Sequence, residues 1–212
     1  MVRKTRIKVC GFTREADLEA ALGLGVDAVG FVLYPPSPRA VTVERTAVLV
    51  SRVPPFVTRV GLFVNEDAGL IGEAASEARL DCLQFHGDET PDDCERFGLP
   101  YIKAVRVRPG LDLLECATRF RAARALLLDA YSDGWGGSGK SFDWSLIPPD
   151  LPLPVILSGG LDPETVADAI RRVAPAAVDV SSGVESAKGI KDVARVAAFI
   201  SGVENGEARP AG

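Results

Sequence analysis

The sequence predicts an α/β protein built as a single (β/α)8 barrel, or TIM barrel. Eight short runs rich in valine, isoleucine and leucine recur along its 212 residues. Most of these runs are continuously apolar, as expected of parallel strands that are covered on both faces, and segments with helical spacing lie between them. An open doubly wound sheet is the main alternative, and the number of expected strands favours the barrel.

The expected strands cover residues 7–10, 28–33, 59–64, 82–86, 101–107, 125–130, 155–158 and 177–181. Strand and helix are expected to alternate eight times. Two segments follow the spacing of one helix face: Val166, Ala169, Ile170 and Val173, and then Val193, Val196, Ala197 and Ile200. Two helices are expected to start with a capping side chain followed by proline at the first helical position: Thr90 with Pro91, and Asp162 with Pro163.

Composition indicates one domain with a large core, because 47% of the residues are hydrophobic. We expect the barrel to span residues 1–203 and residues 204–212 to form a disordered tail. The net charge is -5 and no basic run occurs, so nucleic acid is not an expected partner. With no signal peptide and no run of about 18 apolar residues, we expect a cytoplasmic protein without membrane association. The sequence leaves its oligomeric state, monomer or homodimer, open.

Cysteine and histidine are too few and too scattered for a metal site. The only histidine is His86, and the four cysteines have no CxxC spacing. Because free cysteine is commonly buried, we expect burial for Cys82, Cys94 and Cys116. Cys10 differs, since it stands at the end of the first strand.

The chemistry of such a barrel is expected at the C-terminal ends of its strands. Cys10 ends the first run, and Asp129 follows three leucines near the end of the sixth. The apolar setting of Asp129 suits a general acid, and the thiol suits a base. The alternatives are that Asp129 caps a neighbouring loop and that Cys10 is simply buried.

Two later strand ends have the small residues of a phosphate site. Gly159 and Gly160 follow the seventh strand, and Ser182 and Gly183 follow the eighth. Backbone N–H groups can approach an anion closely there, and many barrels bind phosphate after these two strands. The glycines could also serve only to form the turns, but the two loops together favour a phosphorylated small-molecule substrate.

A glycine-rich segment follows the sixth strand at residues 134–140. With Ser141 it satisfies the pattern GxxxxGK[ST], yet Phe142 and the prolines at 148 and 149 oppose the long helix of a nucleotide site. Nucleotide binding is therefore not expected. The segment is either a loop that folds over a ligand or a flexible connection.

His86 and Arg39 are two further candidates. His86, in FHGDE, is expected to contact the ligand rather than to act as a base, with a plain strand-end hydrogen bond as the alternative. Arg39, in the loop 35–40, offers a planar donor fork that suits a carboxylate or a phosphate. The alternative for Arg39 is a solvated loop arginine.

These motifs resemble the phosphoribosylanthranilate isomerase family of tryptophan biosynthesis from the first strand to the eighth. The resemblance is carried by KVCGFT at 8–13, SPRAV at 37–41, GLFVN at 61–65, LQFHGDE at 83–89, IKAVRV at 102–107, LLLDAY at 126–131, GGSGKSFDW at 136–144, LSGGL at 157–161 and DVSSGVE at 179–185. KVCG, HGDE and DVSSGVE in this order are specific to the family. Phe85, Ser138 and Ser158 depart from its usual leucine, threonine and alanine, and none of these departures removes a catalytic group.

The resemblance implies an Amadori rearrangement of N-(5-phosphoribosyl)anthranilate to 1-(2-carboxyphenylamino)-1-deoxy-D-ribulose 5-phosphate, the third step of the tryptophan branch from chorismate. It needs no cofactor. In this scheme Asp129 protonates the furanose ring oxygen and Cys10 removes the proton from C2. Arg39 holds the anthranilate carboxylate, the loops at Gly160 and at Ser182 and Gly183 hold the phosphate, and Asp179 contacts the ligand.

Two other functions stay open. The first is an aminoaldose isomerase of the histidine pathway, whose family also uses phosphate loops and an Amadori step. In that family the base on the first strand is an aspartate, so the cysteine at position 10 argues against this function. The second is a catalytically silent barrel that only binds a phosphorylated ligand. If this alternative holds, ligand binding should survive the loss of Cys10 and Asp129.

Overall fold

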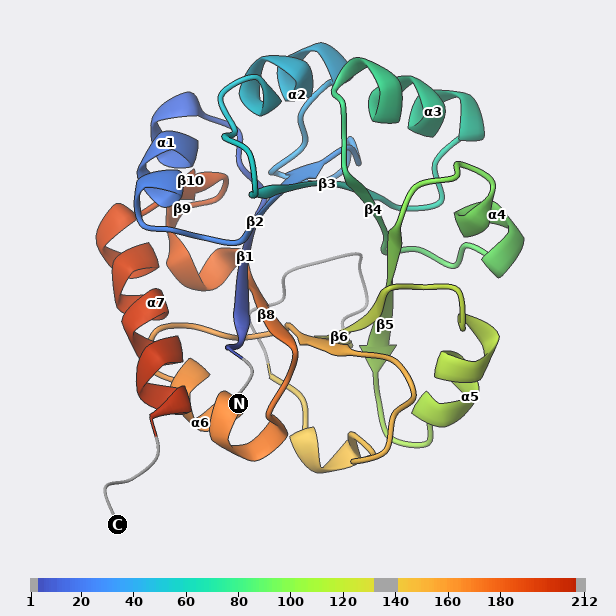
Figure 1. The fold of residues 1–212 in the computed structure, drawn as a ribbon, viewed down its shortest axis with the longest axis vertical. Coiled ribbons are helices and arrows are strands. Elements are labelled where there is room, and N and C mark those ends of the chain that lie inside the picture. Colours follow the sequence, from blue (N-terminus) through green and yellow to red (C-terminus); the bar gives the residue numbers. More distant parts are fainter. Residues whose placement is uncertain (1–3, 132–140, 209–212) are drawn as a thin grey trace.

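Eight parallel strands close into a barrel with helices around its outside (Figure 1). A computed structural model describes residues 4–131 and 141–208 of the chain. Each strand pairs with the next along the sequence, and β8 pairs with β1 to complete the ring. The predicted (β/α)8 barrel is confirmed, and an open doubly wound sheet is excluded because such a sheet has two free edges.

The strand bounds agree with the expected runs to within one residue at each end. The strands are β1 (Arg6–Cys10), β2 (Ala28–Val32), β3 (Thr58–Phe63), β4 (Cys82–Phe85), β5 (Tyr101–Val107), β6 (Ala125–Ala130), β7 (Val155–Leu157) and β8 (Ala177–Val180). Their nearly unbroken apolar composition therefore located them correctly, since both faces of each strand are covered.

The outer ring consists of α1 (Glu15–Gly23), α2 (Val43–Val50), α3 (Ala68–Glu77), α4 (Pro91–Glu95), α5 (Leu113–Arg119), α6 (Val166–Val173) and α7 (Val193–Glu207). Thr90 caps α4 with proline at the first helical position, as predicted. The predicted start of α6 is wrong, because this helix begins at Val166 after Thr165. The Asp162 carboxylate instead accepts hydrogen bonds from the backbone and hydroxyl of Thr165 and closes a separate turn before the helix.

The connection from β6 to β7 departs from the expected alternation. Its described part, residues 141–154, contains the 3-10 helix η1 (Trp144–Leu146) and no α-helix. Prolines at 148, 149, 152 and 154 explain this, because proline in a helix interior removes a hydrogen bond and clashes with the preceding turn. The glycine-rich segment 134–140 lies outside the described residues.

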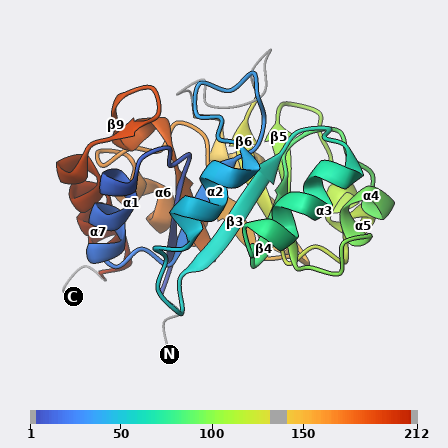
Figure 2. The same cartoon turned by 90° about the horizontal axis from the view of Figure 1, so that it is seen from above.

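An antiparallel hairpin between β8 and α7 was not expected from the sequence. After the 3-10 helix η2 (Ser182–Val184), β9 (Glu185–Ala187) pairs with β10 (Ile190–Lys191), and the chain turns between them with Gly189 at a φ of 79°. Figure 2 shows β9 at the same end of the barrel as the blue loop between β2 and α2. The hairpin is therefore an addition at the end where the strands deliver their C-terminal residues.

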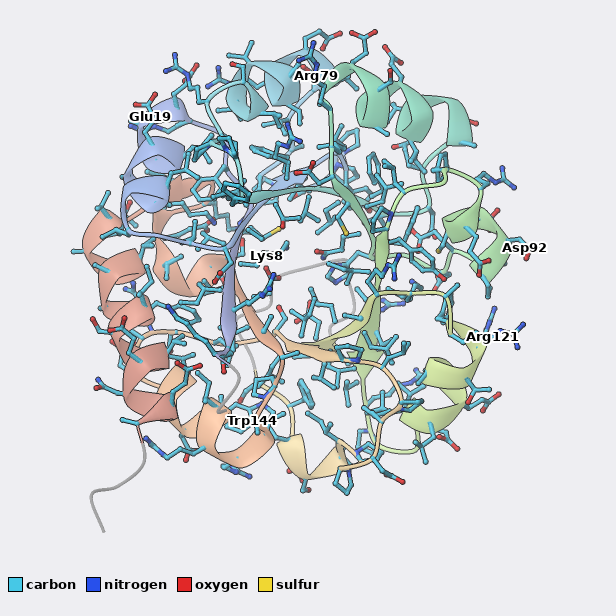
Figure 3. The ribbon with its side chains drawn as sticks, in the orientation of Figure 1. Lys8, Glu19, Arg79, Asp92, Arg121 and Trp144 are labelled. Atoms are coloured by element: carbon cyan, nitrogen blue, oxygen red, sulfur yellow. The ribbon has the colours of Figure 1, made fainter. Side chains whose placement is uncertain are left out.

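Side chains alternate along each strand between the helices and the barrel interior. Leu126 and Leu128 of β6 belong to the large outer core, whereas Leu127 packs in an inner cluster with residues of the other strands. Asp129 occupies the next inward position, because the side-chain period of a strand is two. The same alternation on β1 directs Lys8 and Cys10 inward, and Figure 3 shows Lys8 extending into the interior.

The C-terminal helix corrects the expected domain boundary at residue 203. Helix α7 continues to Glu207 and buries Val196, Phe199, Gly202, Val203 and Gly206, whereas Val193 is exposed. A Cβ on Gly206 would lie 2.9 Å from the Ile170 Cβ and 3.0 Å from the Ala167 carbonyl oxygen of α6. Glycines on this face thus let two helices approach closely, and residues 204–207 are part of the domain. Residues 209–212 lie outside the described part.

No helix in the described ranges, 4–131 and 141–208, has the length and apolarity needed to cross a membrane.

Replacing Gly206 by alanine is expected to lower the free energy of unfolding by about 1–3 kcal/mol, because the added methyl group overpacks the contact between α6 and α7. The matched change is Gly72→Ala in α3, where a Cβ would meet no atom within 4 Å. It is expected to raise stability by about 0.5–1 kcal/mol through helix propensity. Urea denaturation of both variants measures the difference, and equal effects would contradict the close packing of α7 on α6.

Candidate active site

A pocket at the C-terminal end of the barrel brings together nearly all of the predicted site residues. It is lined by Cys10, Arg39, His86, Asp129, Gly159, Gly160, Asp179 and Ser182, among others. Its empty volume is about 720 Å³, counting space open to solvent. Gly183 is the one predicted residue that does not line this pocket.

The Cys10 thiol lines the pocket and lies against β2. A Cβ on Gly30, its partner in β2, would lie only 2.6 Å from the sulfur, so glycine at this position makes room for the thiol. Burial raises the pKa of the Cys10 thiol, and the nearby Lys8 ammonium acts in the opposite direction. The pKa of the Cys10 thiol therefore depends on the positive charge beside it.

Lys8 supplies that charge, although the sequence reasoning did not single it out. Its Nζ donates a hydrogen bond of 2.8 Å to Asp179 Oδ1, and both side chains are buried. Burial alone would lower the pKa of Lys8, but Asp179 and Cys10 raise it above its ordinary value, so the ammonium stays charged. The available signal was a lysine inside an apolar strand, two positions before Cys10 and hence on the same face.

Asp129 is held on two sides. Its Oδ1 accepts a hydrogen bond of 2.8 Å from the backbone N–H of Ala130, and its Oδ2 lies 3.2 Å from His86 Nε2. The amide of Gln84 lies 3.1 Å from His86 Nδ1. With the amide donating to Nδ1, the proton of His86 resides on Nε2 and is donated to Asp129. His86 thus orients the carboxyl group within the pocket.

The loops after β7 and β8 approach each other through glycine. Gly159 and Gly160 both have positive φ, and a Cβ on Gly159 would lie 2.8 Å from Asp129 Oδ1. A Cβ on Gly183 would lie 2.0 Å from the Leu161 carbonyl oxygen. Gly183 is therefore required where the two loops touch, while Gly160 and Ser182 reach the pocket wall.

Arg39 is not the solvated loop arginine of the alternative interpretation. Its Nε and Nη2 donate hydrogen bonds of 2.8 and 2.7 Å to the two carboxylate oxygens of Glu185 in β9. The arginine side chain is 12% exposed and that of Glu185 is 5% exposed. The hydrogen bonds that Arg39 donates to Glu185 raise the pKa of Arg39. Sequence reasoning missed Glu185 as its partner, although this residue ends the motif DVSSGVE.

The other cysteines lie away from the pocket. Cys82 and Cys94 are buried as predicted, but Cys116 is only half-buried because it packs at the margin of the outer core. Within residues 4–131 and 141–208, no group of three or more His, Cys, Asp or Glu side chains is arranged to hold a metal ion.

Similarity to known proteins extends over almost the whole chain. Residues 7–202 match the family model of N-(5'-phosphoribosyl)anthranilate (PRA) isomerase. The N-(5'-phosphoribosyl)anthranilate isomerase of Dechloromonas aromatica is 56% identical over 204 residues, which cover 96% of this chain and 98% of the relative. The chain belongs to the PRA isomerase family.

Solved PRA isomerases have the same fold. The enzyme from Thermotoga maritima is 44% identical and superposes with a TM-score of 0.88 over 94% of this chain and 98% of its own. A PRA isomerase in complex with reduced 1-(o-carboxyphenylamino)-1-deoxyribulose 5-phosphate is 41% identical, with a TM-score of 0.84 and the same coverage. These similarities agree with the family resemblance of the sequence motifs.

The charge of Lys8 provides a test of how this PRA isomerase family member controls its thiol. In Lys8→Met, the pH at which Cys10 becomes a thiolate is expected to rise, because a nearby positive charge that favours the anion is lost. The rate of alkylation of the Cys10 peptide by iodoacetamide, followed by mass spectrometry across pH, measures this shift.

The matched control is Lys103→Met. Lys103 is also buried and pairs with a carboxylate, its Nζ lying 3.0 Å from Glu89 Oε2, but it lies on β5. Its loss is expected to leave the alkylation profile of Cys10 in place. If the pH at which Cys10 becomes reactive is unchanged or lower in Lys8→Met, the electrostatic role of Lys8 is contradicted.

Proposed function

We propose that this chain catalyses the Amadori rearrangement of N-(5-phosphoribosyl)anthranilate, with Asp129 as general acid and Cys10 as general base. One observation carries this proposal: the thiol from the end of β1 and the carboxyl group from the end of β6 line the same pocket. Two groups that transfer protons to and from one substrate must both be within reach of it. Membership of the PRA isomerase family supplies the reaction that needs such a pair.

Asp129 is suited to the first step, in which the furanose ring opens. Its proton passes to the ring oxygen, the bond from that oxygen to C1 breaks, and a Schiff base forms with the substrate nitrogen. His86 and the Ala130 N–H hold the carboxyl group in one orientation. A fixed donor contributes more to catalysis than a mobile one, because it does not have to be reoriented in the transition state.

Cys10 is suited to the second step. Its thiolate removes the proton from C2, the electron pair moves toward the positively charged Schiff base, and an enolamine forms that tautomerises to the ketone. The positive Schiff base and the Lys8 ammonium both favour the thiolate at this stage.

The ends of the substrate have matching partners in the pocket. The Arg39 guanidinium has five N–H donors, of which Glu185 occupies two. The others can bind the anthranilate carboxylate. The loops after β7 and β8 are suited to the phosphate, because the small residues Gly159, Gly160 and Ser182 at the pocket wall let backbone N–H groups approach an anion. Gly183 supports this site by letting the two loops touch.

Other features of this function rest on the sequence. The absence of a cofactor, a direct contact between Asp179 and the ligand, a cytoplasmic location, and a state of monomer or homodimer stay predictions. The cysteine at the end of β1 continues to oppose the histidine-pathway aminoaldose isomerase.

Cys10→Ser and Asp129→Asn are each expected to reduce kcat/KM by at least about 100-fold, the lower range for loss of a general acid or base. The assay follows the fluorescence of phosphoribosylanthranilate, generated in situ from anthranilate and phosphoribosyl pyrophosphate by a transferase. Circular dichroism verifies that both variants retain the fold.

Two control variants make the same chemical changes outside the pocket. They are Cys116→Ser, at a half-buried residue of α5, and Asp150→Asn, at an exposed residue, and both should keep full activity. Retained activity in either pocket variant would refute its assigned role. Failure of the folded wild type to accelerate loss of the signal would favour the silent binder or the histidine-pathway enzyme.

A further inference from the structure

A buried charge network connects the β9–β10 hairpin to Arg39. Glu185 accepts hydrogen bonds from Arg39 with both oxygens, and its Oε1 also accepts one of 2.8 Å from Lys191 Nζ. The Lys191 side chain is 1% exposed. Burial lowers the pKa of Lys191, whereas Glu185 acts to raise it. Glu185 is thus enclosed between two cationic side chains at the margin of the pocket.

The hairpin that carries Glu185 and Lys191 is fixed to the β1–α1 loop, to helix α1 and to the residue that follows β8. The Thr13 hydroxyl donates a hydrogen bond of 2.7 Å to the Gly189 carbonyl, and the Lys191 backbone N–H donates one of 2.9 Å to Asp17. Lys191 Nζ also lies 3.2 Å from the Ser181 carbonyl oxygen. These contacts hold the hairpin independently of Arg39, so Glu185 presents a carboxylate at a set position.

The Arg39 side chain passes directly over the turn that follows Cys10. A Cβ on Gly11 would lie 2.6 Å from Arg39 Cδ, and Gly11 has a φ of 85° that favours glycine. The Ser181 hydroxyl donates a hydrogen bond of 2.9 Å to the Cys10 carbonyl on the same side. The arginine is therefore placed next to the thiol by packing on Gly11 and by the two hydrogen bonds to Glu185.

The charges of this network leave a surplus that suits an anion. Arg39 and Lys191 carry two positive charges and Glu185 carries one negative charge. Burial alone would raise the pKa of Glu185, but Arg39 and Lys191 hold it below its ordinary value, so the carboxylate stays ionised. Because one positive charge remains, a carboxylate at the free edge of the guanidinium would be attracted, whereas an isolated Arg39–Glu185 pair would be neutral overall.

We propose that Glu185, supported by Lys191, is a positioning residue that fixes the Arg39 guanidinium beside Cys10 and so sets the preference for a substrate whose aromatic ring carries a carboxylate. This inference rests on the proposed function of Arg39. It assigns to the hairpin a role in specificity, and Glu185 acts only through Arg39.

Two ligands separate this role from a merely structural one. They are reduced 1-(o-carboxyphenylamino)-1-deoxyribulose 5-phosphate and the phenylamino analogue that lacks the carboxyl group. Calorimetric titration measures the affinity of each for the wild type and for Glu185→Gln. In the wild type the carboxylated ligand should bind at least about tenfold more tightly, as expected for a charge-assisted hydrogen bond. In Glu185→Gln this preference should fall to about threefold or less, while the affinity for the analogue stays unchanged.

The matched control is Asp81→Asn, which breaks another paired arginine–carboxylate contact, with Arg59, where β3 and β4 begin. It should leave both affinities unchanged. Glu185→Asp retains the charge but shortens the side chain, and it should give an intermediate preference; it decides the question if Glu185→Gln does not fold. In steady-state kinetics, Glu185→Gln should raise KM far more than it lowers kcat.

Equal weakening of both ligands in Glu185→Gln would overturn the proposal, because it would indicate general damage to the pocket. An undiminished preference would overturn it as well. If the wild type binds both ligands equally but still turns over phosphoribosylanthranilate, the carboxylate role of Arg39 is wrong and this inference falls with it. If the wild type shows no turnover at all, the proposed function itself has failed.

Discussion

The ion pair between Lys8 and Asp179 is the interaction on which both the barrel and its site depend. It joins the first strand to the last across 171 residues of sequence, at the point where the ring closes. Removing one partner of such a buried pair lowers the stability of the fold by about 3–5 kcal/mol, because an unpaired charge is left in the interior. The same pair places an ammonium group beside the Cys10 thiol. The closure of the fold and the reactivity of the proposed base are therefore coupled through one contact.

Strand periodicity explains why the sequence identified the main site residues. Cys10 and Asp129 occupy inward positions near the C-terminal ends of strands, and both the strand ends and the period of two can be read from local sequence. Lys8 obeys the same rule, but a single lysine between apolar neighbours does not by itself indicate a buried charge, because lysine is rarely buried without a partner. Its partner, Asp179, lies on β8, which neighbours β1 only once the barrel has closed. The pairing of the two charges is therefore visible only in the folded structure.

The remaining differences come from contacts between distant segments. Arg39 and Glu185 are 146 residues apart, and no local pattern marks the short hairpin that brings them together. Helix α7 continues past residue 203 because Gly206 packs on α6, which overrides the polar, glycine-containing sequence that predicted a tail. In the described part of the β6–β7 connection, the prolines prevent the expected α-helix, and only the 3-10 helix η1 forms. Local sequence thus predicted the scaffold and the reacting groups, while tertiary packing determined how these groups are held.

A crystal structure of the wild-type protein with reduced 1-(o-carboxyphenylamino)-1-deoxyribulose 5-phosphate tests the central claim most directly. We expect the ligand's C1 and C2 to lie between the Cys10 sulfur and the Asp129 carboxyl group, with its carboxylate on Arg39 and its phosphate on the loops of Gly160 and Ser182. A ligand bound with its sugar carbons out of reach of Cys10 and Asp129, or with its phosphate and carboxylate ends exchanged, would contradict the account.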